Sequence, residues 1–397
     1  MLIADINPEG IDLLQDSFGR RFYYLRLSIT DVCNFRCQYC LPDGYQGQAQ
    51  QFLSLNEIET LVNAFAQMGT SKIRVTGGEP TLRRDIVDVV ASCAQTEGIS
   101  KVAMTTHAGK LASLAKPLAR AGLNQVNISL DSLEPAQFAL LSGQDKLNAV
   151  LDGVESAIVE GINAKVNAVL LRPWAEAQLR DFTAWLKDMP VTVRFIELME
   201  TGQHKAFFKS HHVSAEPHLA ALKAQGWQAL PRGKDAGPAI ELVHPDYVGR
   251  IGFIMPYSSD FCDSCNRLRI TALGKLHLCL FSEQGLDLRE SLQTGNVQAV
   301  KEFVASSLAD KVFPQRDYRE LDTDVRDRYS QHRVRITFDR ASYEDVNEFA
   351  HLIRQESPYM FLSEVKIEPK YPPKNRPYDP TTYDATFEVS SVEFIKQ

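Results

Sequence analysis

The chain reads Cys33-Asn34-Phe35-Arg36-Cys37-Gln38-Tyr39-Cys40 a few residues after a short apolar run, and this CxxxCxxC motif is its most informative stretch. Three thiolates so close together can ligate three irons of one four-iron cluster, in which each iron normally takes one cysteine. The fourth iron is then open to a ligand that is not protein. A structural zinc site is the alternative, but a closed zinc site takes four ligands, usually in two spaced pairs.

The motif resembles that of the radical S-adenosylmethionine (SAM) superfamily. The resemblance implies a 4Fe-4S cluster on Cys33, Cys37 and Cys40 whose open iron binds SAM, and reductive cleavage of SAM to a 5'-deoxyadenosyl radical. Further along the chain, Gly77-Gly78-Glu79-Pro80 resembles the SAM-binding motif of the same superfamily. Glycine has no Cβ atom, so the backbone there can approach a ligand closely.

Composition limits the classes of function. With 397 residues and 44% hydrophobic content, the chain can fill the cores of two or three domains. Its 43 basic and 50 acidic residues give a net charge of -7. That balance disfavours binding to a nucleic-acid polymer or an anionic membrane. An anionic substrate would therefore need a local cluster of arginines.

Cysteine usage indicates a reducing compartment. Six of the seven cysteines fall in two clusters, a pattern that favours metal ligation over disulfides. The first ten residues show no signal-peptide pattern, and no apolar run reaches the roughly 18 residues of a membrane span. We therefore expect a cytoplasmic protein. The seventh cysteine, Cys93, lies among apolar residues of a predicted helix and is expected to be inert packing.

Short β-rich runs alternate with amphipathic stretches between residues 22 and 200. The predicted strands are residues 23–29, 72–76, 101–106, 125–130, 165–171 and 192–198, and predicted helices include residues 86–96, 111–121 and 147–160. Repeated βα units predict a parallel sheet with helices outside. We expect an α/β fold, a partial (βα)6 TIM-like barrel of the radical SAM type, with its site at the carboxyl ends of the strands.

A second cysteine set lies near residue 270. Cys262-Asp263-Ser264-Cys265 is followed by Cys279, and the segment from Phe261 to Thr271 closely resembles the MoaA family of GTP 3',8-cyclases. The resemblance covers about residues 15 to 310. It implies a radical SAM lyase that cyclises GTP to (8S)-3',8-cyclo-7,8-dihydroguanosine 5'-triphosphate, the first step of molybdopterin biosynthesis. It also implies a second 4Fe-4S cluster, on Cys262, Cys265 and Cys279, that anchors the guanine.

The same resemblance implies roles for individual residues. Cys33, Cys37, Cys40 and Arg269 would be catalytic, and SAM would be bound by Tyr39, Gly78, Ser129 and Met199. GTP would be bound by Arg26, Arg74, Thr105, Lys165, Arg267, Leu268 and Arg269. Arginine suits this role because its planar guanidinium donates paired hydrogen bonds to phosphate and stays charged.

Simpler interpretations exist for three of these positions. Arg74 could form a surface ion pair. Met199 could fill a gap in the core. Ser129 and Asp131 could cap the helix that follows them.

Two features depart from the family. The chain reads Thr105-Thr106-His107-Ala108-Gly109 where the family usually has asparagine and then glycine, and the charge of His107 titrates near neutrality. Family members also usually end in Gly-Gly, whereas this sequence ends in Phe394-Ile395-Lys396-Gln397. These departures leave a second interpretation open, a radical SAM enzyme with an auxiliary cluster that modifies a peptide or another nucleotide. A third is a non-catalytic binding protein with structural clusters or zinc.

The predicted organisation has three parts: a radical SAM barrel (1–215), an auxiliary-cluster region closing the barrel (216–312) and a small α+β extension of unknown role (313–397). In the extension, the mixed charges of residues 315–333 predict an exposed linker or solvated helix. Strands are predicted at 334–338, 361–367 and 385–395, with a proline-rich linker at 369–380. An amphipathic helix is predicted from the spacing of Val346, Phe349, Ala350 and Ile353. The extension could cap the barrel, mediate homodimerisation or bind a partner. We also expect an electron donor such as flavodoxin or ferredoxin.

Overall fold

The computed structural model forms two compact units, Met1–Leu308 and Ala309–Gln397. It describes residues 14–15, 20–47, 51–200, 205–231, 233, 237–258, 261, 265–278, 285–309, 315–326, 329–341, 346, 349, 360–370 and 382–394. Two of the predicted metal ligands, Cys262 and Cys279, therefore lie outside the described residues.

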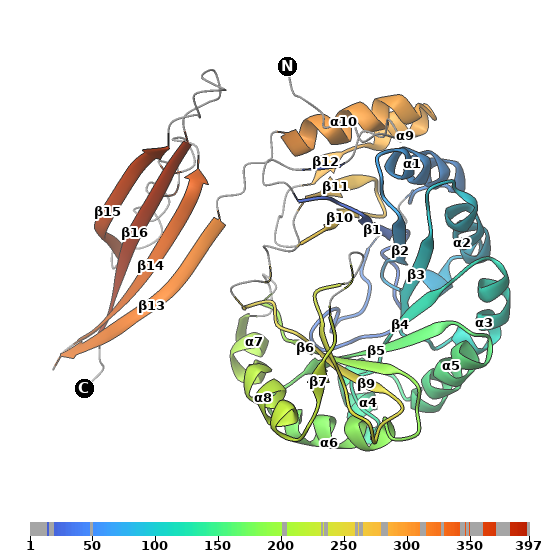
Figure 1. Ribbon diagram of the computed structural model, residues 1–397, viewed down its shortest axis with the longest axis horizontal. Helices are drawn as coiled ribbons and strands as arrows, with labels where there is room; N and C mark the ends of the chain where they lie inside the picture. The colour runs from blue at the N-terminus through green and yellow to red at the C-terminus, as the bar shows by residue number, and fades with distance from the viewer. Residues whose placement is uncertain are drawn as a thin grey trace. The chain divides into compact units, whose positions relative to one another are not determined.

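A single twelve-stranded sheet organises the first unit (Figure 1). Its centre is a run of parallel strands in chain order: β1 (Tyr24–Ser28), β2 (Lys72–Thr76), β3 (Lys101–Thr106), β4 (Gln125–Ser129), β5 (Asn163–Leu170) and β6 (Thr192–Glu197). The sheet curves inside a layer of helices without pairing its two edges, so the predicted α/β fold with an open, partial barrel is confirmed.

Later segments extend both edges of this sheet. β10 (Arg267–Ile270) pairs in parallel with β1, and β9 (Arg250–Ile254) pairs in parallel with β6. Antiparallel additions complete the edges: β11 (Lys275–His277), β12 (Leu286–Asp287), β8 (Ile240–Val243) and β7 (Gln228–Ala229). The pairing of β10 with β1 brings Arg267 and Arg269 beside the strand that precedes the first cysteine motif.

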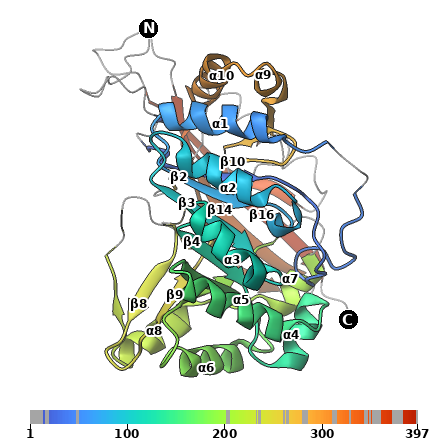
Figure 2. The same ribbon diagram turned by 90° about the vertical axis from the view of Figure 1, so that its right-hand side faces the viewer.

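Helices cover the outer face of the sheet (Figure 2). They are α1 (Leu55–Gln67), α2 (Ile86–Gln95), α3 (Leu111–Arg120), α4 (Pro135–Ser142), α5 (Leu147–Val159), α6 (Ala175–Trp185), α7 (Lys205–His211), α8 (Glu216–Ala224), α9 (Arg289–Gln293) and α10 (Val297–Ala309), with the 3-10 turn η1 (Pro80–Leu82). α1 begins with a capping box, in which Ser54 and Glu57 each bond the other's backbone N–H. Arg289 joins α9 to the same carboxylate, with Nε 2.7 Å from Glu57 Oε1.

Strand residues alternate between two environments. Leu25 and Leu27 of β1, and Ile73 and Val75 of β2, are fully buried in the core beneath the helices. The intervening positions, such as Arg26 and its register partner Arg74, face the inside of the barrel, which we call the lumen. One sheet therefore carries the hydrophobic core on its outer face and polar residues on its inner face.

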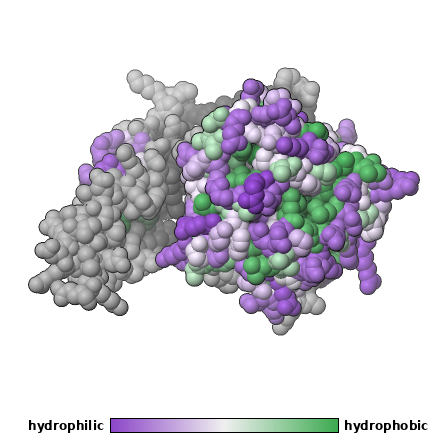
Figure 3. All heavy atoms as spheres, turned by 90° about the horizontal axis from the view of Figure 1, so that it is seen from below, coloured by the Kyte–Doolittle hydropathy of each residue, from purple (hydrophilic) through white to green (hydrophobic). Residues whose placement is uncertain are grey.

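The surface of the first unit is mixed in character. Hydrophilic residues make up much of the face shown in Figure 3, with apolar patches between them. Among the helices that the structure describes, none has the length and apolarity needed to cross a bilayer.

The second unit is a four-stranded antiparallel sheet. Its order is β13 (Gln315–Arg326), β14 (Tyr329–Ala341), β16 (Thr382–Phe394) and β15 (Met360–Lys370). The predicted strands at 334–338, 361–367 and 385–395 fall within β14, β15 and β16, although Ile395 is outside the described residues. The linker or solvated helix predicted for 315–333 is wrong, because β13 pairs along β14 from Gln315 opposite Asp339 to Arg326 opposite Tyr329. Local charge gives no signal of such long-range pairing.

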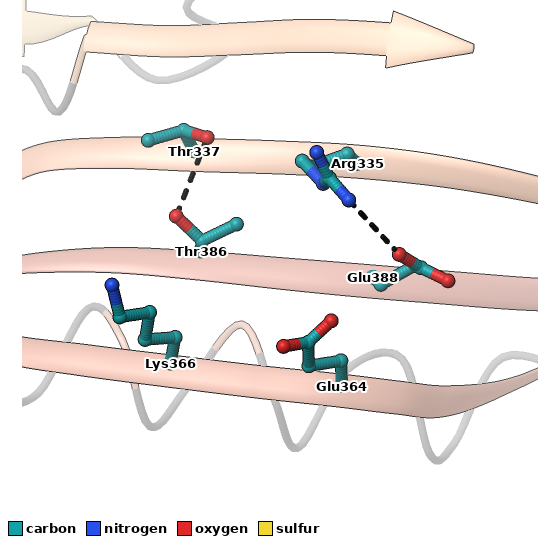
Figure 4. A pocket seen from close by; sticks show the side chains of 6 residues that line it. All are labelled: Arg335, Thr337, Glu364, Lys366, Thr386 and Glu388. Atoms are coloured by element: carbon teal, nitrogen blue, oxygen red, sulfur yellow. Dashed lines mark hydrogen bonds and ion pairs between the residues drawn. The ribbon is translucent and has the colours of Figure 1, made fainter. Parts of the chain in front are cut away.

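One face of this second sheet is apolar and the other polar. Phe338, Phe349 and Phe387 pack edge to face, and Val346 is buried with them. Ala350, Ile353 and residues 371–380 lie outside the described residues. On the polar face, Arg335, Thr337, Glu364, Lys366, Thr386 and Glu388 line a depression (Figure 4). Its Arg335 and Glu388 form an ion pair, with Nη2 and Oε2 3.4 Å apart, so part of the charge there is neutralised internally.

Candidate functional site

The first cysteine motif forms a loop directly after β1. Its backbone is held by the end of α4, because Arg36 N donates to Ser142 O (2.9 Å) and Gln38 N donates to Leu141 O (3.0 Å). Cys33 and Cys37 are partly buried, Cys40 is exposed, and all three are free thiols. We call residues 33–40 the cluster loop.

The thiols of the cluster loop resist ionisation in the protein alone. Burial raises the pKa of Cys33, Cys37 and Cys40, and neighbouring negative groups add to the effect. Metal ligation requires thiolates, so binding would release protons. Among the described residues, no three His, Cys, Asp or Glu side chains converge on a point where a single ion could bind. A four-iron cluster does not need such convergence, because each thiolate ligates a separate iron.

The glycines of Gly77-Gly78-Glu79-Pro80 lie against the segment that leads into the cluster loop. Gly78 N donates to Thr30 O and Glu79 N donates to Val32 O, both at 2.8 Å. A Cβ atom would lie 2.4 Å from Thr30 O at Gly77 and 2.4 Å from Val32 O at Gly78. Side chains are therefore excluded by the neighbouring backbone, which gives a structural reason for both glycines in addition to any approach of a ligand.

Glu79 links this turn to the end of β3. Its buried carboxylate accepts hydrogen bonds from Thr81 Oγ1 (2.6 Å), Thr106 Oγ1 (2.6 Å) and His107 N (2.8 Å). The loops that follow β1, β2 and β3 are thus joined by one network.

His107 follows β3, and hydrogen bonds hold both nitrogens of its ring. Gly109 N donates to its Nδ1 (3.0 Å), so in the neutral ring Nε2 carries the proton and donates to Asn34 Oδ1 (2.8 Å). Burial lowers the pKa of His107. The next residue, Ala108, has φ +61°, a left-handed conformation that glycine adopts without steric cost. This left-handed backbone explains why the family usually has glycine at the position where this chain has Ala108.

Tyr39 and Asp131 connect the cluster loop to β4 and β5. The Tyr39 hydroxyl donates to Asp131 Oδ2 (2.8 Å), and Asp131 Oδ1 accepts from Val169 N (2.8 Å). Burial raises the pKa of Asp131 to about 6. The helix-cap interpretation of Asp131 is wrong, because Glu134 caps α4.

The four predicted SAM contacts all lie at carboxyl ends of strands. Tyr39 and Gly78 follow β1 and β2, Ser129 ends β4, and Met199 comes two residues after β6. Met199 is partly exposed rather than fully buried in the core.

The lumen is strongly basic although the chain as a whole is acidic. Strand register and alternation place the following cations on its wall: Arg26, Lys72, Arg74, Lys165, Arg194, Arg267 and Arg269. In contrast, Leu268 points to the opposite face of β10, where its side chain is 1% exposed in the core. Among the residues predicted for GTP, the side chain of Leu268 is therefore not a lumen group.

Three lumen arginines have unmet hydrogen-bonding capacity. The Nε atoms of Arg26, Arg74 and Arg194 are buried and have no hydrogen-bond partner within the described part of the chain, and the same holds for Thr105 Oγ1. Burial and then the neighbouring arginines Arg269 and Arg74 lower the pKa of Arg26 to about 9, so it stays protonated at neutral pH. Strand alternation places Arg74 on the lumen face, and among the described residues it forms no ion pair of the kind considered for it. Concentrated positive charge with buried donors that lack partners among the described residues indicates an anionic ligand.

Arg194 and Glu241 are among the lumen residues that were not predicted from the sequence. Arg194 is 4% exposed, its Nη2 lies 2.5 Å from Asn127 Oδ1, and burial lowers its pKa to about 10. Glu241 is an acid on β8 that pairs with Lys165, with Oε1 and Nζ 2.5 Å apart. The available signal was an arginine in the middle of an apolar strand, Val193-Arg194-Phe195. Glu241 gave none, because its contact with Lys165 spans 76 residues.

Cys265, the described member of the second cysteine set, lies beside the lumen. Burial alone would raise its pKa, but Arg267 outweighs burial and the pKa is lowered. Arg267 Nη2 lies 3.7 Å from the Cys265 sulfur. A positive group therefore favours the thiolate at this position.

Comparison with known proteins assigns the family. Residues 27–186 match the Radical SAM superfamily model, and residues 191–315 match the Molybdenum Cofactor Synthesis C model. GTP 3',8-cyclase of Actinobacillus pleuropneumoniae serotype 5b is 49% identical over 300 residues, covering 75% of this chain and 88% of the relative. The chain belongs to the GTP 3',8-cyclase family. GTP 3',8-cyclase of Aeromonas hydrophila subsp. hydrophila agrees, at 50% identity over 306 residues, 75% of this chain and 90% of the relative.

Solved structures support the fold of this GTP 3',8-cyclase family member. Streptococcus suis SuiB bound to S-adenosylmethionine superposes with a TM-score of 0.52 at 13% identity, covering 72% of this chain and 68% of SuiB. At that identity the likeness concerns the radical SAM fold alone. Both family models end by residue 315, so most of the second unit lies beyond them.

Proposed function

We propose that this chain catalyses the SAM-dependent radical cyclisation of GTP to (8S)-3',8-cyclo-7,8-dihydroguanosine 5'-triphosphate, the first step of molybdopterin biosynthesis. The observation that carries the proposal is the basic lumen. The buried Nε atoms of Arg26, Arg74 and Arg194 have no hydrogen-bond partner among the described residues, and Arg26 lies on the strand that leads into the cluster loop. A triphosphate would supply the missing negative charge and acceptors.

The residues of the cluster loop fit a 4Fe-4S cluster. Cys33, Cys37 and Cys40 offer three free thiols on one loop, fixed by α4 and by the His107 contacts. When bound, the cluster and SAM together supply the adenosyl radical that starts the cyclisation. We propose Cys262, Cys265 and Cys279 as ligands of a second cluster, supported by the positive environment that favours the Cys265 thiolate.

The protein's own side chains would bind and orient the two substrates. We assign SAM to Tyr39, Gly78, Ser129 and Met199, at the carboxyl ends of the strands. We assign the triphosphate to Arg26, Arg74, Lys165, Arg194, Arg267 and Arg269, with Thr105 as a neutral donor. Arg269 would contact GTP directly and act as a catalytic residue. Lys165 can bind phosphate once it leaves Glu241, so binding would exchange one anionic partner for another.

The reaction also needs a partner that delivers electrons. We propose a small one-electron donor such as flavodoxin or ferredoxin, and a cytoplasmic location, because clustered thiols require a reducing compartment. A homodimer is the assembly we propose to test by sedimentation.

Anaerobic incubation of reconstituted protein with SAM and dithionite tests the proposal. Separate reactions receive GTP, ATP or a peptide mixture, and products are identified by mass spectrometry. We expect consumption of GTP with formation of 5'-deoxyadenosine and the cyclised nucleotide. Consumption of ATP or peptide instead would support a different radical SAM reaction. Absence of SAM cleavage with every substrate would favour a binding protein.

A further inference from the structure

Tyr24 is a buried polar residue on the lumen face of β1. Tyr24 is 1% exposed, and its hydroxyl has no hydrogen-bond partner among the residues that the structure describes. A buried hydroxyl without a partner lowers the stability of the fold. Such a group in a lumen position therefore calls for an explanation.

Cations surround the Tyr24 ring. In the strand register, Tyr24 lies opposite Lys72 on β2 and Arg267 on β10. Lys72 Nζ is 4.9 Å and Arg74 Cζ is 5.1 Å from the ring centroid, distances typical of cation–π contacts. These contacts hold the ring in place on the lumen face of β1.

Two of the arginines with unpartnered Nε atoms lie near Tyr24: Arg74, which contacts its ring, and Arg26, which lies on the same strand. Arg26 lies two residues along β1, whereas Arg194 lies on β6, across the lumen. The cations around the Tyr24 ring can only donate hydrogen bonds, so none of them can accept one from its hydroxyl.

We propose that the Tyr24 hydroxyl is a ligand of the GTP triphosphate, donating a hydrogen bond to a phosphate oxygen held among Arg26, Arg74 and Arg194. This role rests on the proposed function. A phosphate oxygen accepts from the phenol and the guanidinium groups together, so one anion satisfies all the buried donors at once. A phenol adds a neutral donor with few rotatable bonds, which helps to fix the position of the phosphate.

A purely structural role is the rival explanation, in which the ring only supports the strands. Tyr24→Phe separates the two, because it keeps the ring and its cation contacts and removes only the hydroxyl. Tyr23→Phe is the matched control, since successive residues of an extended chain point to opposite faces.

The experiment uses reconstituted holoenzyme under anaerobic conditions. Equilibrium dissociation constants are measured for GTP, inorganic tripolyphosphate and guanosine, and thermal unfolding is measured without ligand. We expect Tyr24→Phe to raise the dissociation constants of GTP and tripolyphosphate by about 10- to 100-fold, the usual effect of one hydrogen bond to a charged group. The midpoint of unfolding without ligand should be unchanged or higher. Guanosine binding by Tyr24→Phe, and the dissociation constants of GTP and tripolyphosphate for Tyr23→Phe, should match the wild type.

Two outcomes would overturn the role of Tyr24. One is an unchanged GTP dissociation constant in Tyr24→Phe, and the other is a loss of GTP affinity that tripolyphosphate does not share. Failure of the wild type to bind GTP would instead remove the proposed function. If Tyr24→Phe does not fold, 3-fluorotyrosine placed at position 24 gives a second measurement. Its fluorine resonance should shift when tripolyphosphate is added, and no shift at saturation would overturn the proposal.

Discussion

The imidazole of His107 lies flat on the phenyl ring of Phe35, with ring centroids 3.7 Å apart and 5° between the planes. Phe35 is inside the cluster loop, and His107 follows β3. The histidine that departs from the family's asparagine therefore faces the cluster loop, where it also bonds Asn34. Its structural effect is to fix that loop to the neighbouring strand.

The first prediction concerns this stacked pair. His107→Ala should lower the free energy of unfolding by about 1–3 kcal/mol, because it removes a hydrogen bond and an aromatic contact. It should also speed the loss of iron to a chelator. His211→Ala is the matched control, since His211 stacks on Phe207 with centroids 4.0 Å apart and 8° between planes, on α7. Equal rates of iron loss in both variants would contradict a specific effect on the cluster loop.

The second prediction concerns the two cysteine sets. Reconstituted wild type should contain about eight irons and eight sulfides per chain, from two four-iron clusters. Joint replacement of Cys33, Cys37 and Cys40 by alanine should halve the iron and abolish SAM cleavage. Cys93→Ala should keep all the iron, because Cys93 is buried on α2 and burial raises its pKa to about 12. Zinc without iron in the wild type would refute the assignment.

The third prediction concerns Arg269. Arg269→Ala should weaken GTP binding by about ten- to a hundredfold, since a hydrogen bond to a charged group typically contributes about 1.5–3 kcal/mol. SAM cleavage without GTP should persist. Calorimetric titration with GTP and assay of 5'-deoxyadenosine measure the two effects. If both Arg269→Ala and Arg267→Ala bind GTP like the wild type, the substrate is not held by β10.

The fourth prediction concerns pH. Burial and the neighbouring arginines lower the pKa of Arg26 to about 9, still above neutrality. The ordinary pKa of lysine is about two units below that of arginine, so in Arg26→Lys the same surroundings should bring the lysine toward neutrality. GTP binding needs the protonated form. Its affinity in Arg26→Lys should therefore fall as pH rises from 6 to 8.5, relative to wild type, and a constant ratio of the two dissociation constants would contradict the prediction.

The fifth prediction concerns the second unit. Because residues 1–308 form a compact unit, truncation after Lys311 should leave iron content, SAM binding and GTP affinity at their full-length values. Iron analysis and calorimetry measure these. A truncated chain that cannot be reconstituted would show that the extension is needed for folding.

The sequence predicted the barrel well because local pattern and fold agree there. The strands at 72–76 and 101–106 were placed correctly, since β-branched and apolar runs stand between amphipathic helices. The family resemblance, and not the local sequence pattern, gave the prediction that Arg267 and Arg269 contact the substrate. Glu241 and the Phe35–His107 stack were not predictable, because each depends on contacts between residues far apart in the chain. Strand β13 was missed because its mixed charges indicate helix or linker, whereas pairing with β14 determines its conformation.

The alternation along the barrel strands limits which changes of length the chain can accept. Within β1, core residues Leu25 and Leu27 alternate with lumen residues Tyr24 and Arg26. Deleting or inserting one residue inside such a strand would turn its arginine toward the helices and its leucine toward the lumen. Substitutions can thus alter ligand binding or stability one at a time, whereas a one-residue change in strand length would damage both together. Length variation among relatives should accordingly be confined to the segments between strands.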